Sequence, residues 1–334
     1  MHALKMFGMA PLKSTIEENG IQITLISSTV LTPYSGMLPG IVAGHYTAEE
    51  SHLDLRKLCS FSGIRFIHAA ATGVTYDSIG GGGGWISCSD GRPDVRYDTL
   101  SIDIGCSPTI PDSLCSNSDS DSAETVTPVK PISTFSQRWD GICERLKKSS
   151  PDAYTPKRPF ILLVVGAGAG GIELALSAHH TLLNILEEKS YPDPAGCIKI
   201  VLVTRGMDLL PSHNAGVRRI FCRILQERNI DVQYGAEAIG VNSEIDASGV
   251  AKKSLKLSDS SCNQSKISFD ECLWCTSAGA SSWLSENTPF ETTTDGFIKV
   301  NDTYETVSHK GVFSAGDCCH MVHNPRPKGM LRFI

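Results

Sequence analysis

The second half of the chain alternates between short apolar runs and longer segments of mixed polarity. The run "FILLVV" at 160–165 precedes a glycine-rich turn and a segment in which apolar residues recur at helical spacing. Two more strand-like runs, "CIKIVLVTRG" and "IDVQYGAEAIGV", flank the amphipathic segment "NAGVRRIFCRILQERN". Strands that alternate with helices in this order are typical of a parallel sheet covered by helices. We therefore predict an α/β fold for this region.

The beginning of the chain is less regular. A strand rich in β-branched residues is predicted at 21–28, and the prolines and glycines of 32–46 are expected to exclude any regular element there. The segment 49–63 has the spacing of a helix with its leucines inward, and Gly63 is expected to end it.

The next stretch combines strands with turn and loop signals. Strands are predicted at 64–78 and 95–105, and the glycine run at 80–85 is interpreted as a hairpin tip because no helix follows it. The polar, acidic segment 112–127 is predicted to be a solvated insertion. An amphipathic helix is predicted at 132–149.

Composition narrows the class of protein. The 334 residues suggest two domains, at about 150 residues per domain. The net charge is −6 without a block of lysines or arginines, so nothing favours nucleic acid or an anionic membrane as a partner. No apolar run approaches the ~18 to 20 residues of a membrane span, and the N-terminal stretch is not typical of a signal peptide. We expect a soluble globular protein.

The 12 cysteines are scattered over the chain, which favours reduced thiols in an intracellular compartment over a disulfide scaffold. Cys272 and Cys275 form a C-x-x-C within a strand-like run, where residues three apart point to opposite faces. The cluster "CCHMVH" at 318–323 contains adjacent cysteines, which rarely bind one ion together. We therefore predict no metal site and no redox disulfide.

The strongest chemical signal is the glycine-rich turn after 160–165. Gly166, Gly168 and Gly171 fit G-x-G-x-x-G, and Gly170 lies in the same turn. In such a turn the first glycine permits a tight bend, the second lets backbone amides approach a pyrophosphate, and the third allows helix and strand to pack closely. Because the turn joins a strand to a helix, we predict a dinucleotide site here.

The residue at the end of the next strand usually indicates which nicotinamide nucleotide binds, because Asp or Glu there holds the ribose hydroxyls of NAD. This chain has Thr204 and Arg205 at that point. Arg205 can meet the 2′-phosphate of NADP or can be a solvated loop residue. The pattern slightly favours NADPH and leaves both nucleotides open.

A second candidate site follows the strand in "GVFSAGDC". Asp317 stands at the tip of this strand, where a carboxylate can accept a hydrogen bond from the ribityl chain of FAD. A carboxylate at that place can also cap a helix. With a separate dinucleotide unit upstream, we favour FAD.

The chain resembles the pyridine nucleotide-disulfide oxidoreductase family. Within that family it is most similar to the type II NADH dehydrogenase-like branch found fused to, or encoded beside, selenophosphate synthetase. The resemblance rests on blocks spread over nearly the whole chain: "TPYSGMLPGIVAGHYTAEESHLDLRKL", "YDTLSIDIG", "TPVKPI", "VVGAGAGGIELAL", "LVTRGMDLLPSHNAGVRR", "GVFSAGDC" and "PRPK".

The resemblance implies two nested Rossmann-like domains. An FAD domain would combine residues 1–157, including the insertion at 112–127, with residues 281–334. An NAD(P) domain at 158–280 would be inserted between these parts. The family's FAD domain opens with a strand and a phosphate loop, which this sequence lacks, and its last helix continues beyond "PRPK". The resemblance therefore implies that the chain is truncated at both ends.

The resemblance also implies roles for single residues. Glu173 resembles the glutamate near nicotinamide and flavin, and the segment that lines the flavin on its substrate side is matched by Thr32, Pro33 and Tyr34. Lys130 and Lys328 would lie near the isoalloxazine, although both can equally be surface lysines.

Two departures from the family pattern bear on the chemistry. Ser277 replaces the glycine of the usual A-T-G motif, which puts close backbone approach at that point in doubt. The chain has no C-x-x-C on an early helix, and this argues for direct electron transfer through flavin instead of disulfide chemistry.

Together these features predict a FAD-dependent NAD(P)H oxidoreductase. Hydride would pass from nicotinamide to flavin, and electrons would then pass to a quinone or a small oxidised compound. The alternative is a non-catalytic NAD(P)-binding protein or a truncated, flavin-free gene fragment. The resemblance implies a functional link to selenophosphate synthetase, allows a homodimer, and is compatible with a cytoplasmic or organellar location.

Overall fold

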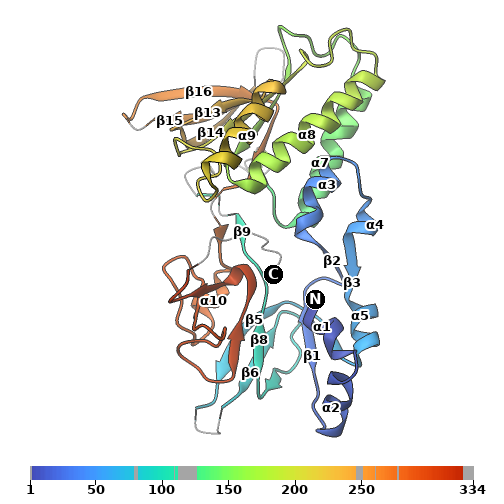
Figure 1. The fold of residues 1–334 in the computed structure, drawn as a ribbon, viewed down its shortest axis with the longest axis vertical. Helices are drawn as coiled ribbons and strands as arrows, with labels where there is room; N and C mark the ends of the chain where they lie inside the picture. Colours follow the sequence, from blue (N-terminus) through green and yellow to red (C-terminus); the bar gives the residue numbers. More distant parts are fainter. Residues whose placement is uncertain are drawn as a thin grey trace. The chain divides into compact units, whose positions relative to one another are not determined.

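The computed structural model describes residues 2–78, 82–108, 110–111, 126–245, 251–259, 261–276 and 278–325. The chain forms two compact units (Figure 1). Unit 1 comprises the described residues of 1–34, 48–106 and 279–328, and unit 2 those of 35–47 and 107–278. Each unit therefore combines segments that are far apart in the sequence.

The sheet of unit 2 has parallel strands in the order β10-β17-β11-β12-β13. Their bounds are Thr127–Pro128 for β10, Phe160–Val165 for β11, Ile198–Val203 for β12, Asp231–Gln233 for β13 and Glu271–Trp274 for β17. Every residue of β11 except Ile161 is buried, as expected for a parallel strand covered on both faces. The predicted α/β fold with a parallel sheet is confirmed.

Helices cover one face of this sheet. They are α3 (Leu38–Val42), α7 (Ile132–Lys148), α8 (Ala169–Glu188) and α9 (Ala215–Glu227). Figure 1 shows α8 beside α7 and α3, and their buried side chains share one hydrophobic core with the sheet. The helices predicted at 132–149 and after the glycine turn are confirmed.

An antiparallel three-stranded sheet covers the other face. It consists of β14 (Glu237–Ile245), β15 (Ala251–Ser258) and β16 (Gln264–Phe269). Leu255 of β15 packs with Val201 of β12 in a second core. The single strand predicted over "IDVQYGAEAIGV" is wrong in extent. Gly235 has φ +62, and β13 ends before this turn while β14 begins after it.

The expectation that 32–46 contains no regular element is wrong. Strand β2 (Leu31–Pro33), the 3-10 helix η1 (Ser35–Met37) and α3 all lie there. A proline in the first turn of a helix costs no hydrogen bond, and α3 has its proline in that position. Its last turn is held by Thr181, whose hydroxyl donates to the carbonyl of Val42 at 2.6 Å.

Unit 1 is built from small sheets. Parallel pairs join β1 with β4, β8 with β20, and β19 with β21, while β5, β6 and β7 form an antiparallel sheet. The bounds are Thr24–Ser27 for β1, Arg65–His68 for β4, Ala71–Tyr76 for β5, Gly84–Cys88 for β6, Val95–Tyr97 for β7, Leu100–Ile102 for β8, Ile298–Val300 for β19, Val312–Ser314 for β20 and Cys319–Met321 for β21. Strands β5 and β6 flank the glycine run, as predicted for a hairpin.

The helix predicted at 49–63 is interrupted. It is replaced by α4 (Ala48–Ser51), β3 (His52–Asp54) and α5 (Leu55–Ser62), and Leu53 on β3 is exposed instead of buried. Asp54 caps α5, because its carboxylate accepts from the backbone N–H of Arg56 at 2.9 Å. Gly63 ends α5 with φ +66, as predicted.

The remaining described elements are short. They are α1 (His2–Phe7), α2 (Leu12–Glu18), β9 (Ser107–Pro108), β18 (Ala278–Gly279), α10 (Trp283–Glu286) and the 3-10 helix η3 (Gly316–Cys318). No helix in the described part of the chain is both long and apolar enough to pass through a membrane. The predicted insertion at 112–127 lies outside the described residues, apart from 126 and 127.

Candidate functional site

The glycine turn joins β11 to α8 at the carboxyl edge of the unit 2 sheet. The backbone N–H of Gly166 donates to the carbonyl of Val203, the last residue of β12, at 2.8 Å. On the other side, Cys275 donates from its N–H to the carbonyl of Val165 at 2.8 Å. The ends of β12 and β17 therefore flank the turn, on the two sides of β11.

This place is a topological switch point. From β11 the chain continues through α8 to β12 and then β13 on one side, whereas the later strand β17 pairs with the other edge of β11, so the order of strands reverses here. Open parallel sheets bind ligands at such points, outside the carboxyl ends of the strands. The helix α8 starts here, and its first backbone N–H groups carry the positive end of the helix dipole.

The glycines of the turn divide into two kinds. A Cβ on Gly171 would lie 1.8 Å from the carbonyl oxygen of Gly166, and Gly166 itself has φ +118 with backbone atoms of Cys275 and Thr276 close by. These two glycines are needed for packing. A Cβ on Gly168 or Gly170 would meet no described atom within 4 Å. The backbone is therefore open at Gly168 and Gly170, where a phosphate group would have to approach.

Arg205 lies at the carboxyl end of β12, as predicted. Its side chain is 83% exposed, and its Nη1 lies 3.7 Å from Oε1 of Glu237 at the start of β14. Thr204 accepts a hydrogen bond from the N–H of Gly206 through its hydroxyl at 3.2 Å, which shapes the turn after β12. The sequence analysis did not single out Glu237.

Glu173 lies in the first turns of α8. Partial burial raises the pKa of its carboxyl, and the nearby His213 opposes this shift. Lys130 follows β10 and is half-buried in the same unit. Unit 2 thus contains seven of the predicted site residues: the four glycines of the turn, Arg205, Glu173 and Lys130.

The segment predicted to line a flavin lies in unit 1. Thr32 and Pro33 are in β2, which pairs antiparallel with β3, and Tyr34 follows. The N–H of Tyr34 donates to the carbonyl of Ser51 at 3.0 Å, and the ring of Tyr34 is partly exposed. Lys328, the other predicted flavin-side lysine, lies outside the described residues.

Asp317 lies just beyond β20, within η3, so the predicted strand-tip position is correct while the helix that follows is a single 3-10 turn. Asp103 follows the parallel neighbour β8. A Cβ on Gly316, where φ is +69, would lie 2.4 Å from Oδ1 of Asp103. Burial raises the pKa of Asp103, and the charge of Asp317 adds to the shift. Sequence reasoning missed Asp103, although it stands in the quoted block "YDTLSIDIG".

Cys272 lies in β17 and is buried, and Cys275, the residue after β17, is half-buried. Burial raises the pKa of the Cys275 thiol to about 12 and shifts that of Cys272 in the same direction. In unit 1, the Cys318 thiol donates to the carbonyl of Ala315 at 3.2 Å. Among the described residues, no group of three or more His, Cys, Asp and Glu side chains is placed to hold a metal ion.

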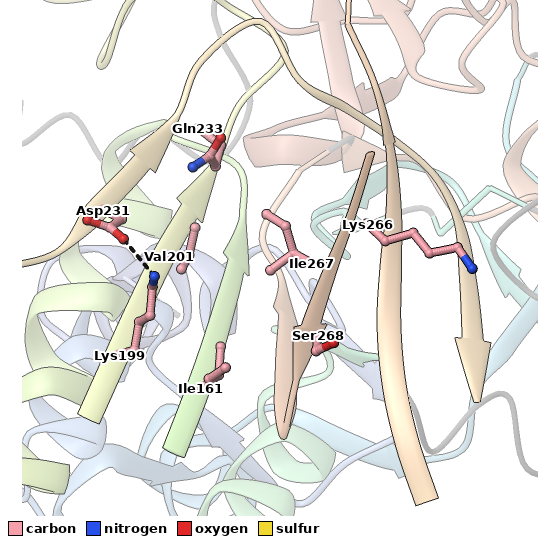
Figure 2. A pocket seen from close by; sticks show the side chains of 8 residues that line it. All are labelled: Ile161, Lys199, Val201, Asp231, Gln233, Lys266, Ile267 and Ser268. Carbon is pink, nitrogen blue, oxygen red and sulfur yellow. Dashed lines mark ion pairs between the residues drawn. The ribbon is translucent and has the colours of Figure 1, made fainter. Parts of the chain in front are cut away.

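A separate cavity of about 290 Å³ lies between the unit 2 sheet and β16 (Figure 2). It is lined by Ile161, Lys199, Val201, Asp231, Gln233, Lys266, Ile267 and Ser268. Lys199 and Asp231 form an exposed ion pair at 3.2 Å, drawn as the dashed line in Figure 2. Ile161, Lys199 and Asp231 stand at the beginnings of their strands, so this cavity is not part of the glycine turn at the strand ends.

The parallel sheet, its switch point and the open glycine turn define a Rossmann-like α/β fold. Residues 10–331 match the family model described as pyridine nucleotide-disulphide oxidoreductase. The chain belongs to this family. No curated protein matches its sequence.

Solved structures share this fold. NDH2 from Plasmodium falciparum in complex with NADH has a TM-score of 0.72 at 17% identity, over 90% of this chain and 60% of that one. The sulfide:quinone oxidoreductase of Aquifex aeolicus has a TM-score of 0.68 at 15% identity, over 95% of this chain and 66% of that one. The water-forming NADH oxidase from Lactobacillus brevis bound to NADH has a TM-score of 0.63 at 14% identity, over 95% of this chain and 60% of that one. This chain therefore spans about 60% of the length of the NDH2 structure.

Proposed function

We propose that this chain is a FAD-dependent NAD(P)H oxidoreductase. The nicotinamide nucleotide would bind at the glycine turn of unit 2, in a domain spanning 158–280. FAD would bind in a domain made of 1–157 and 281–334. The observation that carries the proposal is the open backbone at Gly168 and Gly170, at the start of α8 and at the switch point of a parallel sheet.

The glycine turn fits a pyrophosphate. An anion at this place would meet backbone N–H groups and the positive end of α8, and no described side chain occupies the space next to Gly168 and Gly170. Glu173 would lie near the nicotinamide, where its carboxylate would help to hold the ring. Arg205 would lie at the adenosine end.

The strand ends of unit 1 fit a ligand that carries hydroxyl groups. Asp317 would accept a hydrogen bond from the ribityl chain of FAD, while Thr32, Pro33 and Tyr34 would line the flavin. Lys130 and Lys328 would lie near the ring system. With both cofactors bound, hydride transfer from nicotinamide to flavin would be the chemistry that they supply. The acceptor would be a quinone or a small oxidised compound, and the functional link to selenophosphate synthetase belongs to the same proposal.

One observation supports a second candidate, an NAD(P)-binding protein without turnover. Among the described residues, no parallel strand of unit 1 leads through a glycine turn into an α-helix, whereas β11 does so in unit 2. Unit 2 therefore has a pyrophosphate cradle that the described part of unit 1 does not have. Flavin binding separates the two candidates.

The first experiment measures cofactor binding by the purified chain. We expect NADH and NADPH to bind in a fluorescence titration, and we expect FAD to be retained or taken up with a visible flavin spectrum. A protein that binds NADPH but takes up no FAD would overturn the oxidoreductase proposal in favour of the second candidate.

The site itself is tested by Gly168→Leu. Gly168 has φ −74 and ψ 179, which leucine can adopt, so the variant should fold while its side chain blocks the pyrophosphate. We expect NAD(P)H affinity to fall by about 100-fold, or roughly 2.7 kcal/mol. The matched control is Gly141→Leu on α7, where a Cβ also meets no described atom within 4 Å. Unchanged affinity in Gly168→Leu would show that the turn is not the site.

A further inference from the structure

The turn after β12 is held from two sides. The N–H of Leu210 donates to the carbonyl of Ala167 at 3.1 Å, which ties the turn to the glycine loop. The N–H of Ala236 donates to the carbonyl of Thr204 at 2.9 Å, which ties it to the chain between β13 and β14. Glu237 follows Ala236 directly, so these backbone bonds place its carboxylate at the same carboxyl edge of the sheet.

Arg205 and Glu237 form an ion pair that a ligand can replace. The atoms Nη1 and Oε1 are 3.7 Å apart, and the side chains are 83% and 56% exposed. An exposed pair of this kind contributes little to stability. Each side chain can therefore exchange its partner for a ligand group at small cost.

The other carboxylate of this turn is already engaged. Asp208 accepts from Nη1 of Arg218 at 3.0 Å, and the same guanidinium also donates to the carbonyls of His213 and Pro211. This network fixes Asp208 within the turn. Glu237 is therefore the carboxylate that the structure places next to Arg205.

The two groups suit the two forms of the nucleotide. The ribose of NADH has vicinal hydroxyls, which donate well to a carboxylate, and the 2′-phosphate of NADPH suits a guanidinium. A carboxylate beside a 2′-phosphate is unfavourable, because like charges repel.

We propose that Glu237 is the residue that discriminates between NADH and NADPH, acting as a pair with Arg205. This inference rests on the proposed function of the glycine turn. Glu237 accepts the ribose hydroxyls of NADH, although it comes from β14 and not from the end of β12. Arg205 turns from Glu237 to the 2′-phosphate when NADPH binds. Glu237 thereby lets one site accept both nucleotides and limits the preference for NADPH.

The experiment compares Glu237→Gln and Arg205→Gln with the unsubstituted chain. The dissociation constants of NADH, NADPH, 5′-AMP and 2′,5′-ADP are measured by titration, and the last two report on the adenosine end alone. In Glu237→Gln we expect NADH to bind more weakly and NADPH more tightly, so that the preference for NADPH rises by about tenfold. In Arg205→Gln we expect the preference to move in the opposite direction.

The control is Asp231→Asn, which removes another exposed ion pair, at the beginnings of β12 and β13 and away from the turn after β12. Lys199 and Asp231 are 48% and 53% exposed (Figure 2). We expect no change in nucleotide preference in this variant. If Glu237→Gln binds both nucleotides with an unchanged preference, the proposed role of Glu237 is wrong, and the proposed function of the glycine turn is not affected. If the unsubstituted chain binds neither nucleotide, the proposed function fails as well.

Discussion

Two strands that pair in parallel, β11 (FILLVV) in unit 2 and β1 (TLIS) in unit 1, lie in different surroundings. Strand β11 pairs with β12 on one edge and with β17 on the other, and all of its residues except Ile161 are buried. Among the named strands, β1 pairs with β4 alone, and all of its residues are half-buried. An apolar run in the sequence therefore predicts a strand. Whether that strand becomes the centre of a hydrophobic core depends on the strands that pair with it.

The strand ends of the two units also differ in chemistry. In unit 2 the strand β11 leads into backbone N–H groups at the start of α8, which favour a negatively charged ligand. In unit 1 the neighbouring strands β8 and β20 lead to the carboxylates of Asp103 and Asp317. Carboxylates favour a ligand that donates hydrogen bonds. The two units therefore offer opposite groups at equivalent positions in their parallel strands.

The largest expected effect comes from truncating one leucine in each strand. Leu163 in β11 is fully buried, so Leu163→Ala should cost about 2–5 kcal/mol of unfolding free energy. Leu25 in β1 is half-buried, so Leu25→Ala should cost less than half as much. Because a protein with two units need not unfold in one step, the measurement is amide hydrogen exchange resolved by peptide. Equal losses at the two positions would contradict the comparison.

A smaller effect is expected within the glycine turn. Gly171→Ala would place a Cβ 1.8 Å from the carbonyl oxygen of Gly166, so backbone must move, at a cost of about 1–3 kcal/mol. In Gly170→Ala the added Cβ would have no described atom within 4 Å. Unit 2 should therefore be as stable as before, or slightly more stable, because alanine favours a helix over glycine. Thermal unfolding of both variants provides the measurement. A stable Gly171→Ala would show that α8 and β11 approach less closely than described.

Sequence reasoning succeeded where the signal is local. One short segment contains the strand β11, the glycine turn and the start of α8. An apolar run encodes the strand, and the turn is encoded by glycines because the backbone there has no room for a side chain at Gly166 and Gly171. It failed where distant segments decide the outcome. Helix α3 forms in a segment rich in proline and glycine because Leu38 and Val42 are buried against the other helices of unit 2.

The candidate site shows the same division. The four glycines and Arg205 could be found from the motif and its spacing. Glu237 could not, because it lies in a later strand and reaches Arg205 only through the backbone bonds between Thr204 and Ala236. Asp103 carried a weaker signal, since its place after β8 becomes meaningful only when β20 is known to be the parallel neighbour.

The smallest effect, with no expected change in stability, concerns the reactivity of the thiols. The thiolate is the form that reacts, so a raised pKa lowers the reactive fraction at a given pH. With its pKa raised to about 12, Cys275 would be about 1 part in 10,000 thiolate at pH 8. Iodoacetamide at that pH should therefore label the exposed Cys262 long before Cys272 or Cys275.

The same labelling compares the two units. Cys318 in unit 1 is buried and its pKa is also raised by burial, so it too reacts mainly when the surrounding chain opens. Because the small sheets of unit 1 should open more readily than the central sheet of unit 2, we expect Cys318 to be labelled before Cys272. Peptide mapping by mass spectrometry over a time course reports both sites, and Cys262 serves as the exposed reference. If Cys272 reacted first, the sheet around β11 and β17 would be the weaker of the two, and the contrast between the units would be reversed.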